Sequence, residues 1–309
     1  MMIRGQFSDF FFETMLPALN AKVWRAQRLK PKTYPKLYDI ETTGRSIEQR
    51  SQMVGVGMFG EVAEGASTNT DNFQQGFDKT FKPRKFGLGI ACSQELVEDD
   101  KLGIVSRRAV ALAEAAEETC EVDAASTFNN AFTAGAYAGP DAVALCSASH
   151  PLVKAGGLQS NVLSVAADLD VSSLELALTG WETQVSAEGF ALTLPTPRLL
   201  VAPANRWNAH EILKGEWRSD SANRTVNAFR FAENGPVSEI IVWNKLTDAD
   251  AWFLVAPPEQ TGLLWLWRKR MYTRADYIEK KETGILYMRY RKDHGFHDYV
   301  GVFGTAGAG

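Results

Sequence analysis

The 309-residue sequence is poor in cysteine and histidine and contains no long apolar run. Its three cysteines, Cys92, Cys120 and Cys146, include no Cys-x-x-Cys pair, so we expect reduced core thiols in a cytosolic product. No stretch approaches the roughly 20 apolar residues that a membrane helix needs. Asp9 and Glu13 interrupt the only apolar N-terminal segment, which argues against a secretory signal. These absences predict a soluble protein that is not exported through a visible signal.

The sequence also lacks an excess of charge of either sign. Lys and Arg total 33 against 37 Asp and Glu, a formal net charge of -4, so no global basic field indicates a nucleic-acid-binding protein. The hydrophobic share of 45% excludes a disordered or collagen-like chain. Aromatic residues make up 11% of the chain, and this content suits extensive packing both within a subunit and between subunits.

No catalytic, cofactor-binding or metal-binding constellation emerges from the sequence. Gly55, Gly57 and Gly60 spell GxGxxG, but a dinucleotide site needs a buried strand before the glycines and a helix after them. The residues on both sides are polar and poor in helix formers. His294 and His297 are three residues apart, so on a strand they point to opposite faces and cannot share a metal ion. The sequence therefore predicts neither an enzyme nor a resident cofactor.

Ser149 and His150 are neighbours in the sequence, which does not by itself suggest a catalytic pair. Adjacent residues do not place the serine hydroxyl against the ring of the same histidine, and no GxSxG turn surrounds them. We expect His150-Pro151 to form a turn in which the histidine side chain makes a hydrogen bond.

Residues 1–36 begin with an aromatic cluster and continue as a basic segment, without an acidic residue from position 22 to 36. One interpretation is an N-terminal helix followed by a solvated linker. The other is an arm that lies on a neighbouring subunit, with contacts from Arg25, Arg28 and Lys30.

Residues 44–92 alternate apolar and other residues with a period of two, interrupted by glycines, around a polar tip at 65–76. This period predicts a long β-hairpin, with a bulge or an edge strand where the parity changes at Pro83. Two strands alone cannot shield each other's faces, so the hairpin must pack on its own domain or lie across a neighbouring subunit. In the second case six residues would make the contacts: Met53, Val56, Met58, Phe59, Phe77 and Phe81.

Apolar residues at steps of three and four predict one long helix over residues 98–132. Its apolar face is largely alanine, so another backbone can approach closely, and about 30 residues give a rod of roughly 45 Å. Glu98, Asp99 and Asp100 lie at its start, where carboxylates complement the helix dipole. Such acids could bind a hard cation, but Lys101 beside them favours a role in the helix start and in bridging to another subunit.

The remaining sequence alternates short strands and short helices. A capping box at Ser172-Ser173-Leu174-Glu175 predicts a helix that ends at Gly189. A further short helix is expected over 205–213, and apolar segments predict strands at 198–202, 239–243, 252–256, 263–267, 285–291 and 296–303. Because strands lie both before and after the helices and no βαβ unit repeats, the predicted fold class is α+β.

Four segments carry a family resemblance: KTFKPRKFGLGIACSQELVEDDKLG (79–103), SASHPLVKAGGLQSN (147–161), PRLLVAPANRWNAHEIL (197–213) and TDADAWFLVA (247–256). In this order, after a basic arm and a long hairpin, they resemble the major capsid proteins of tailed bacteriophages, which have the Hong Kong 97-type fold. The run from the hairpin into the acid-rich helix start and the later HP…G..SN segment is similar to the Mu-type major head subunit group. The resemblance covers essentially the whole chain.

The resemblance implies five parts: an N-terminal arm (1–44), an extended loop (45–85), a peripheral domain with a spine helix (86–164), an axial domain (165–265) and closing strands of the peripheral domain (266–309). It also implies pentamers and hexamers that form an icosahedral virion shell around double-stranded DNA, which is held by non-specific contact. A separate scaffolding protein, a portal and decoration proteins are the further partners expected. Assembly is expected in the host bacterial cytoplasm, without a membrane.

Two other functions stay open at this level. One is an encapsulin-like shell of the same fold that stores a cargo enzyme, and a cargo-binding groove with its cargo protein would identify it. The other is a soluble hydrolase, which a mechanism-based probe would label.

Overall fold

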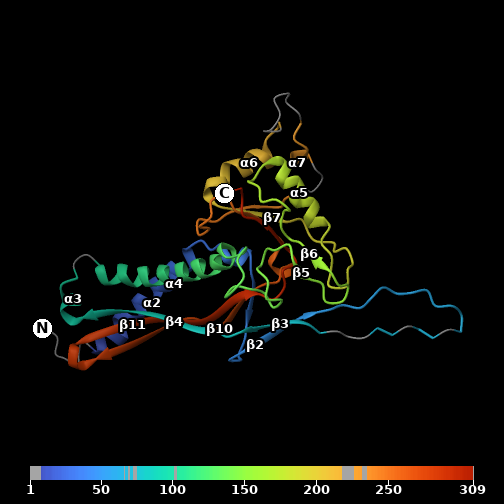
Figure 1. Cartoon of the computed structure of the whole chain (residues 1–309). Coiled ribbons are helices and arrows are strands. Elements are labelled where there is room, and N and C mark those ends of the chain that lie inside the picture. The colour runs from blue at the N-terminus through green and yellow to red at the C-terminus, as the bar shows by residue number, and fades with distance from the viewer. Residues whose placement is uncertain are drawn as a thin grey trace.

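The computed structural model describes residues 8–65, 67–68, 70–71, 75–100, 103–217, 226–231 and 235–308. The chain forms an elongated layer, a second part that lies over one end of this layer, and a loop that projects beyond that end (Figure 1). The elongated layer and the second part each contain a four-stranded sheet with helices. The predicted α+β class is therefore confirmed.

The sheet of the elongated layer has the strand order β1-β10-β11-β4. Its strands are β1 (Asp39–Thr42), β10 (Leu263–Ile278), β11 (Thr283–Phe296) and β4 (Arg84–Ser93). β10 and β11 stay paired as far as Ile278 and Thr283, with register shifts on both sides of Lys269, so their ribbon is much longer than the sequence predicts. The outer half of β10 is charged and lacks the apolar alternation that marks a half-buried strand. β4 is an edge strand that begins directly after Pro83, as predicted.

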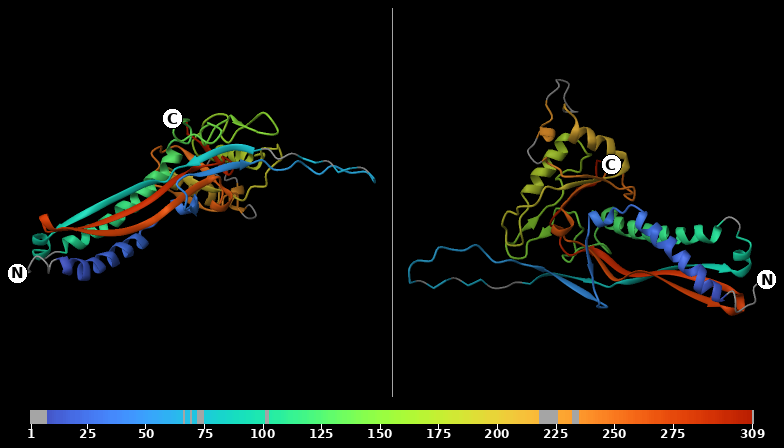
Figure 2. Two further views of the ribbon diagram at one scale, coloured as in Figure 1. Left: turned by 90° about the horizontal axis from the view of Figure 1, so that it is seen from below. Right: turned by 180° about the vertical axis from the view of Figure 1, so that it is seen from behind.

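Two helices cover one face of this sheet, α2 (Leu16–Leu29) and α4 (Ile104–Asn129) (Figure 2). A π-helical turn, η1 (Phe11–Met15), precedes α2. Ala109 and Ala113 of α4 are fully buried beside Leu19 and Val23 of α2, because small side chains let the two helices approach closely. None of the helices in the described part of the chain is both long and apolar enough to cross a membrane.

The single helix predicted over residues 98–132 is two helices in the structure, α3 (Gln94–Glu98) and α4. Gly103 lies between them with φ +67°, in the left-handed region that favours glycine. The Asp100 carboxylate then accepts hydrogen bonds from Ile104 N at 2.7 Å and Val105 N at 3.1 Å. The prediction was wrong about where the long helix begins, because helical periodicity continues through a break that the backbone makes at glycine.

The second part has a sheet in the order β12-β9-β7-β8, and helices α5 and α6 flank it (Figure 1). The elements are α5 (Val171–Glu182), β7 (Arg198–Val201), α6 (Arg206–Lys214), α7 (Ala228–Phe231), β8 (Ile240–Val242), β9 (Trp252–Val255) and β12 (Val302–Thr305). Asp170 and Ser173 form the capping box of α5, with Ser173 N donating to Asp170 Oδ1 at 2.6 Å. The box predicted at Ser172 was therefore wrong by two positions, and the helix ends seven residues before Gly189.

Smaller elements complete the chain. The paired strands β2 and β3 form the base of the projecting loop, and β5 pairs with β6. Their bounds, and those of the short 3-10 helices, are β2 (Glu48–Met53), β3 (Gln75–Phe81), β5 (His150–Pro151), β6 (Leu158–Gln159), η2 (Tyr34–Lys36), η3 (Pro203–Asn205), η4 (Pro258–Gln260) and η5 (Glu279–Lys281).

One aromatic core joins the two sheets. Trp265 of β10 stacks on Tyr34 at 4.5 Å between ring centres. The ring centre of Phe128 of α4 lies 6.0 Å from that of Trp243, which follows β8 in the second sheet. It lies 5.3 Å from the ring centre of Phe253, which is part of β9. The cysteines are buried and unpaired, as predicted. Much of the aromatic content therefore lies within the subunit, where it fixes the two parts against each other.

Two predicted boundaries do not fit the strand pairing. The boundary between residues 265 and 266 falls inside β10. The last strand, β12, pairs with β9 in the second sheet and not with β11. The prediction that residues 266–309 close the peripheral domain is wrong for this strand, because the turn after Phe296 carries the chain across to the other sheet.

Candidate assembly surfaces

The projecting loop is held by a short hairpin at its base. β2 and β3 pair from Glu48↔Phe81 to Met53↔Gln75. The described residues of the loop between Met53 and Gln75 form no strand. The two-residue alternation from Met53 to Val62 predicted a strand there, and this prediction was wrong. Gly55, Gly57 and Gly60 interrupt that segment, and glycine disfavours a strand through its conformational freedom.

The part of the loop beyond the hairpin displays large apolar side chains to solvent. The exposed fractions are 57% for Val56, 78% for Met58 and 101% for Phe59. The loop reaches away from both sheets (Figures 1 and 2), and the described part of the subunit leaves these side chains exposed. Large apolar groups gathered in one exposed segment mark an interaction surface.

The root of the loop contacts two segments of the body, one between β5 and β6 and one that follows α5. Glu188 accepts a hydrogen bond from Gly55 N, and Lys154 forms an ion pair with Asp71. The same Asp71 carboxylate accepts from Gly57 N at 2.7 Å. These contacts hold the two limbs together where they leave the body, and therefore set the direction in which the loop projects.

The other predicted loop contacts lie differently. Phe77 is half-buried beside Phe296 and Tyr299, where it lines a small cavity. Phe81 is 1% exposed and packs on Leu264 and Leu266 in the subunit's own core. Phe81 is therefore removed from the expected inter-subunit contacts, because alternation at the hairpin base points it inward. The side chain of Met53 lies outside the described residues.

The basic arm lies on its own subunit. α2 packs along α4, and Lys30 and Lys32 form ion pairs with Glu118 at 2.8 Å and Glu117 at 2.7 Å. Lys30 is thus held within the subunit and is not a free contact for a neighbour, which corrects that part of the prediction. The reason is a row of acids along α4 that the sequence analysis did not match with the arm.

Arg25 and Arg28 remain on the surface of α2. Both are exposed, and Arg28 Nε donates to the backbone oxygen of Trp24, one helical turn earlier, at 3.2 Å. Exposed Leu29 lies in the same region. It lines a shallow hollow of about 520 Å³ that side chains of both α2 and α4 border. This patch combines positive charge with an apolar side chain.

The acidic residues before α4 divide into two roles. Asp100 is half-buried and caps the helix, as its hydrogen bonds to the first turn show. Glu98 and Asp99 are exposed. Glu98 and Asp99 are therefore placed to contact another molecule.

Comparison with known proteins gives this arrangement a family. The sequence model of a family described as phage capsid protein matches residues 77–304, which is most of the chain. The chain belongs to the phage capsid protein family. None of the curated proteins matches the sequence.

The capsid protein also resembles solved structures. The capsid of cyanophage P-SCSP1u has a TM-score of 0.61 at 8% identity, over 89% of this chain and 88% of that one. Mycobacterium phage Bobi gives 0.57 at 13% identity, over 89% and 90%. A virus-like particle from Pyrococcus furiosus gives 0.53 at 8%, over 94% and 99%. These likenesses show the fold, and they confirm the predicted Hong Kong 97-type fold.

The capsid protein buries one lysine that the sequence analysis missed. Lys292 is 1% exposed, and its Nζ donates to Asp123 Oδ2 at 2.5 Å and lies 4.2 Å from the ring centre of Trp265. Burial lowers the pKa of Lys292, while the Asp123 charge acts in the opposite direction. The signal was present in the sequence, because Lys292 continues the buried parity of Leu286 and Met288 along β11.

The histidines of the capsid protein are packed inside the subunit or half-buried. His150 Nδ1 is 2.7 Å from Asp141 Oδ2, and the ring stacks on Tyr299 at 3.8 Å, in line with the predicted hydrogen-bonding role. Burial, assisted by the nearby Lys292 charge, lowers the pKa of His294 to about 3. Within the part of the chain that the structure describes, no group of three or more His, Cys, Asp or Glu could hold a metal ion.

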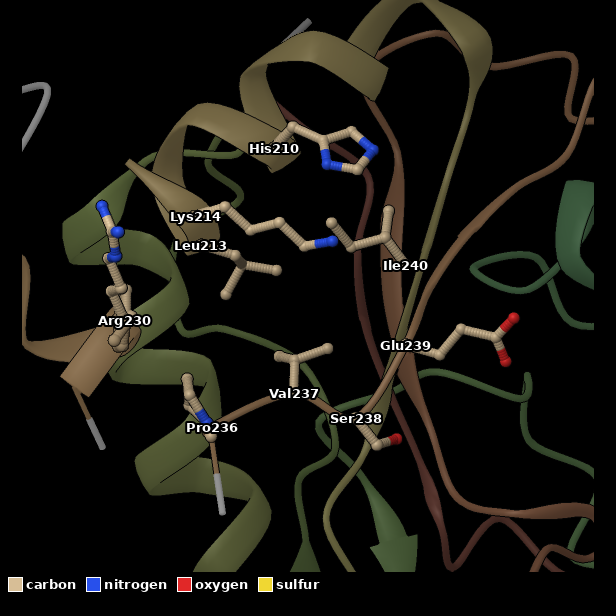
Figure 3. Close-up of a pocket in the computed structure, with 11 residues that line it drawn as sticks. His210, Leu213, Lys214, Arg230, Pro236, Val237, Ser238, Glu239 and Ile240 are labelled. Carbon is tan, nitrogen blue, oxygen red and sulfur yellow. The ribbon is translucent and has the colours of Figure 1, made fainter. Parts of the chain in front are cut away.

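A hollow of about 590 Å³ lies between α6, α7 and the segment before β8 (Figure 3). His210 and Lys214 reach toward it from successive turns of α6. Ser238 Oγ donates to a backbone oxygen at 3.1 Å, and Glu239 points away from the hollow and pairs with Lys36. Among the described lining residues, Ser238 is therefore engaged with the backbone and Glu239 with Lys36.

Proposed function

We propose that this capsid protein is the subunit of an icosahedral phage head, assembled from pentamers and hexamers around double-stranded DNA. The observation that carries the proposal is the projecting loop with Val56, Met58 and Phe59 exposed. Fully burying one such side chain contributes roughly 1.5–3 kcal/mol. The loop gains this stabilisation only when a neighbouring subunit covers it, so burial and assembly are coupled. The same contact is repeated around each closed ring, so the stabilisation from single contacts adds up over the shell.

The proposed contacts between subunits involve fewer residues than those expected from the sequence. Val56, Met58 and Phe59 supply the apolar contact. Arg25 and Arg28 of α2 supply positive charge, and the acids at Glu98 and Asp99 complement them across a subunit boundary. In the folded subunit all these side chains face solvent, which supports their role between subunits.

The proposed domains follow the sheets. The arm (1–44) and the extended loop (45–85) precede a peripheral domain that contains α4, β4, β10 and β11. The axial domain contains α5, α6 and the sheet of β7, β8, β9 and β12. This division differs from the sequence-based one in the placement of β12, whose pairing with β9 supports it.

The further partners in this proposal are a separate scaffolding protein, a portal and decoration proteins. Assembly takes place in the host cytoplasm, and the virion is the final location. The near-neutral net charge of -4 supports non-specific rather than tight contact with DNA. The Mu-type subgroup remains the proposed relationship within the family, supported by the segments at 79–103 and 147–161.

A loop deletion tests the proposal directly. Met53 and Gln75 face each other across the hairpin, so an Asn-Gly turn in place of residues 54–74 can close the two strands without strain. We expect this subunit to keep its thermal unfolding midpoint within a few degrees and to form no shells in negative-stain microscopy. Normal particles from the shortened subunit would contradict the proposal.

A substitution at the loop provides the matched control. Replacing Val56, Met58 and Phe59 together with serine should reduce the assembled fraction as the deletion does. Val165→Ser serves as control, because this valine is 76% exposed and lies outside the loop. It should leave assembly unchanged.

The family match favours a phage head over the encapsulin-like alternative. Particles from the native source can be treated with nuclease and then analysed for protected DNA and for a copurifying enzyme. Protected double-stranded DNA supports the head, whereas a stoichiometric cargo enzyme without DNA would support the alternative.

A further inference from the structure

A hollow of about 630 Å³ lies at the junction of β3 and β4. The junction is near the middle of the molecule, close to the C-terminal end of α4 (Figure 1). Four separate parts of the chain line the hollow: residues 79–84, Thr127, residues 136–137 and residues 293–296. Sites for small molecules commonly have volumes of roughly 300–1,000 Å³, so the hollow has the size that a small ligand requires.

Three cations line this hollow. Lys82 and Arg84 are exposed on either side of buried Pro83. Alternate residues of an extended segment point to the same side, so these two side chains project together. Lys79 of β3 is the third cation. The short stretch from β3 into β4 therefore concentrates positive charge at one place.

Lys79 closes one wall of the hollow. Its Nζ donates to the backbone oxygen of Ala138 at 2.5 Å, which ties β3 to the segment that follows α4. Burial lowers the pKa of Lys79, and the charges of Asp293 and Asp141 oppose this effect. A lysine ammonium group has three donors, so the bond to Ala138 leaves donors for a ligand.

Asp293 is the acid among the described residues that line the hollow. Both of its oxygens accept hydrogen bonds from the backbone, Oδ2 from Lys82 N at 2.6 Å and Oδ1 from His294 N at 3.0 Å. These bonds hold the turn between β3 and β4 against the end of β11. One carboxylate faces three cations, so the hollow keeps an excess of positive charge.

The charge of the three cations is not neutralised within the subunit. Lys79, Lys82 and Arg84 take part in no ion pair among the described residues. Burial lowers the pKa of His294, and the Lys292 and Arg84 charges add to this effect. Like charges that gather in one place repel each other. A bound anion would remove this repulsion.

An aromatic ring borders the same hollow. Tyr137 is one of the lining residues, and it is 39% exposed. Phe81 and Phe296, on the other walls, are buried in the core. An exposed aromatic ring beside positive charge is the combination on which nucleic-acid bases stack while their phosphates are neutralised.

We propose that this hollow binds a free nucleotide, with its phosphates on Lys79, Lys82 and Arg84 and its base on Tyr137. Hydrogen bonds between two charged groups are the strong ones, and an arginine can hold two phosphate oxygens at once. Duplex DNA presents its phosphates along an extended backbone, whereas a hollow of this volume admits a small molecule. The site belongs to the single subunit and does not depend on the proposed shell.

Calorimetric titration of the unassembled, full-length subunit with ATP tests the proposal at physiological salt. We expect saturable binding of one ATP per subunit. Adenosine lacks phosphate and should bind at least tenfold more weakly. Inorganic phosphate should also bind at least tenfold more weakly, because it cannot stack on Tyr137. Absence of saturable ATP binding would overturn the proposal and leave the proposed function standing.

Substitutions assign the binding to this hollow. Lys82→Gln with Arg84→Gln removes two exposed charges and should weaken ATP binding at least tenfold. Arg84→Lys alone keeps the charge and should stay within threefold of the unmodified chain. Tyr137→Ala should weaken ATP binding at least threefold and leave the binding of inorganic phosphate as it is. Unchanged ATP binding in the double variant would overturn the proposal.

A matched control separates local from general charge effects. Lys280→Gln with Lys281→Gln removes the same number of charges at exposed positions of η5, which do not line the hollow. The control should bind ATP within twofold of the unmodified chain. Thermal unfolding verifies that each variant is folded. Equal losses in the control and in the hollow variant would contradict a site at Lys82 and Arg84.

Two further outcomes would also overturn the proposal. Displacement of ATP by a short DNA duplex at equal phosphate concentration would assign the cations to the nucleic-acid backbone. Loss of shells in Lys82→Gln with Arg84→Gln, together with unchanged ATP binding, would assign them to a contact between subunits. We expect this variant to assemble normally while its nucleotide site is lost.

Discussion

Lys292 of β11 and Asp123 of α4 form an ion pair of 2.5 Å inside the subunit. The lysine is fully enclosed by the Trp265 and Phe86 rings, at 4.2 and 5.1 Å from Nζ, whereas the aspartate side chain is 27% exposed. The pair connects the spine helix to the strand beneath it. The two charges of the pair therefore differ in desolvation, because the lysine charge is removed from water and the aspartate charge is partly exposed.

This difference in solvent exposure leads to a prediction about stability. Asp123→Ala leaves the Lys292 charge unpaired in an apolar site, and we expect a loss of about 3 kcal/mol in the free energy of unfolding, at the lower end for a broken buried pair. Lys292→Met keeps the volume and removes the charge, and should cost less than about 1.5 kcal/mol. Urea unfolding of the subunit measures both. A greater loss of unfolding free energy from Lys292→Met than from Asp123→Ala would show that the unpaired lysine charge is not the main source of the destabilisation.

The helix cap gives a second prediction. Asp100→Ala removes the carboxylate that accepts from Ile104 N and Val105 N, and loss of a cap costs about 1 kcal/mol. Asp99→Ala, one residue earlier and exposed, is the matched control and should change stability by less than about 0.5 kcal/mol. Denaturant unfolding compares the two. Equal effects would mean that Asp100 acts through general charge and not through the cap.

The arm gives a third prediction, which separates folding from assembly. Lys30→Glu places an acid beside Glu118 and should lower the thermal midpoint of the subunit by a few degrees, because like charges repel at the 2.8 Å site. Arg25→Glu with Arg28→Glu changes only exposed charges. This double variant should keep the midpoint and make assembly more sensitive to salt. Light scattering across a salt series detects the change, and an unaltered salt profile would count against an arm contact between subunits.

The fourth prediction concerns pH. Burial lowers the pKa of His294 to about 3 from its ordinary value near 6.5, so the unfolded chain binds more protons between these values. The stability that comes from the neutral buried ring is present above pH 6.5 and falls as the pH drops toward 3, by up to about 1.4 kcal/mol per pH unit.

Replacing His294 with glutamine should therefore flatten the pH dependence of unfolding between pH 6.5 and 4. His210→Gln, at a half-buried position of α6, should leave the profile as it is. Unfolding midpoints measured across this range decide the matter. An unchanged slope in His294→Gln would show that other groups control the acid sensitivity.

Local pattern was enough to predict the class and order of the parts. Steps of three and four identified the body of α4, since a helix with one buried face must repeat in this way. A short apolar run identified β9, and the predicted strand at 285–291 lies in the outer half of β11, where buried and half-buried residues alternate. The two-residue period of the loop predicted a hairpin whose two strands cannot shield each other's faces. The family resemblance rested on short segments in a fixed order, and the family match confirmed it.

Positions that depend on distant partners were not accessible in this way. The charged outer half of β10 is a strand because β11 pairs with it, and the arm lies on α4 because Glu117 and Glu118 meet its lysines. The pairing of β12 with β9 follows from the path of the chain and not from its own four residues.

The sequence by itself determined that this protein has a long alanine-faced helix, an α+β body and a glycine-bearing loop with large apolar residues, because each is a property of neighbouring residues. Only the tertiary structure decided which surfaces remain free. Arg28 and Lys30 look alike in the sequence, yet one is exposed and the other is paired within the subunit. Lys85, Arg291 and Lys269, far apart in the sequence, are neighbours only because strand pairing brings β4, β11 and β10 side by side.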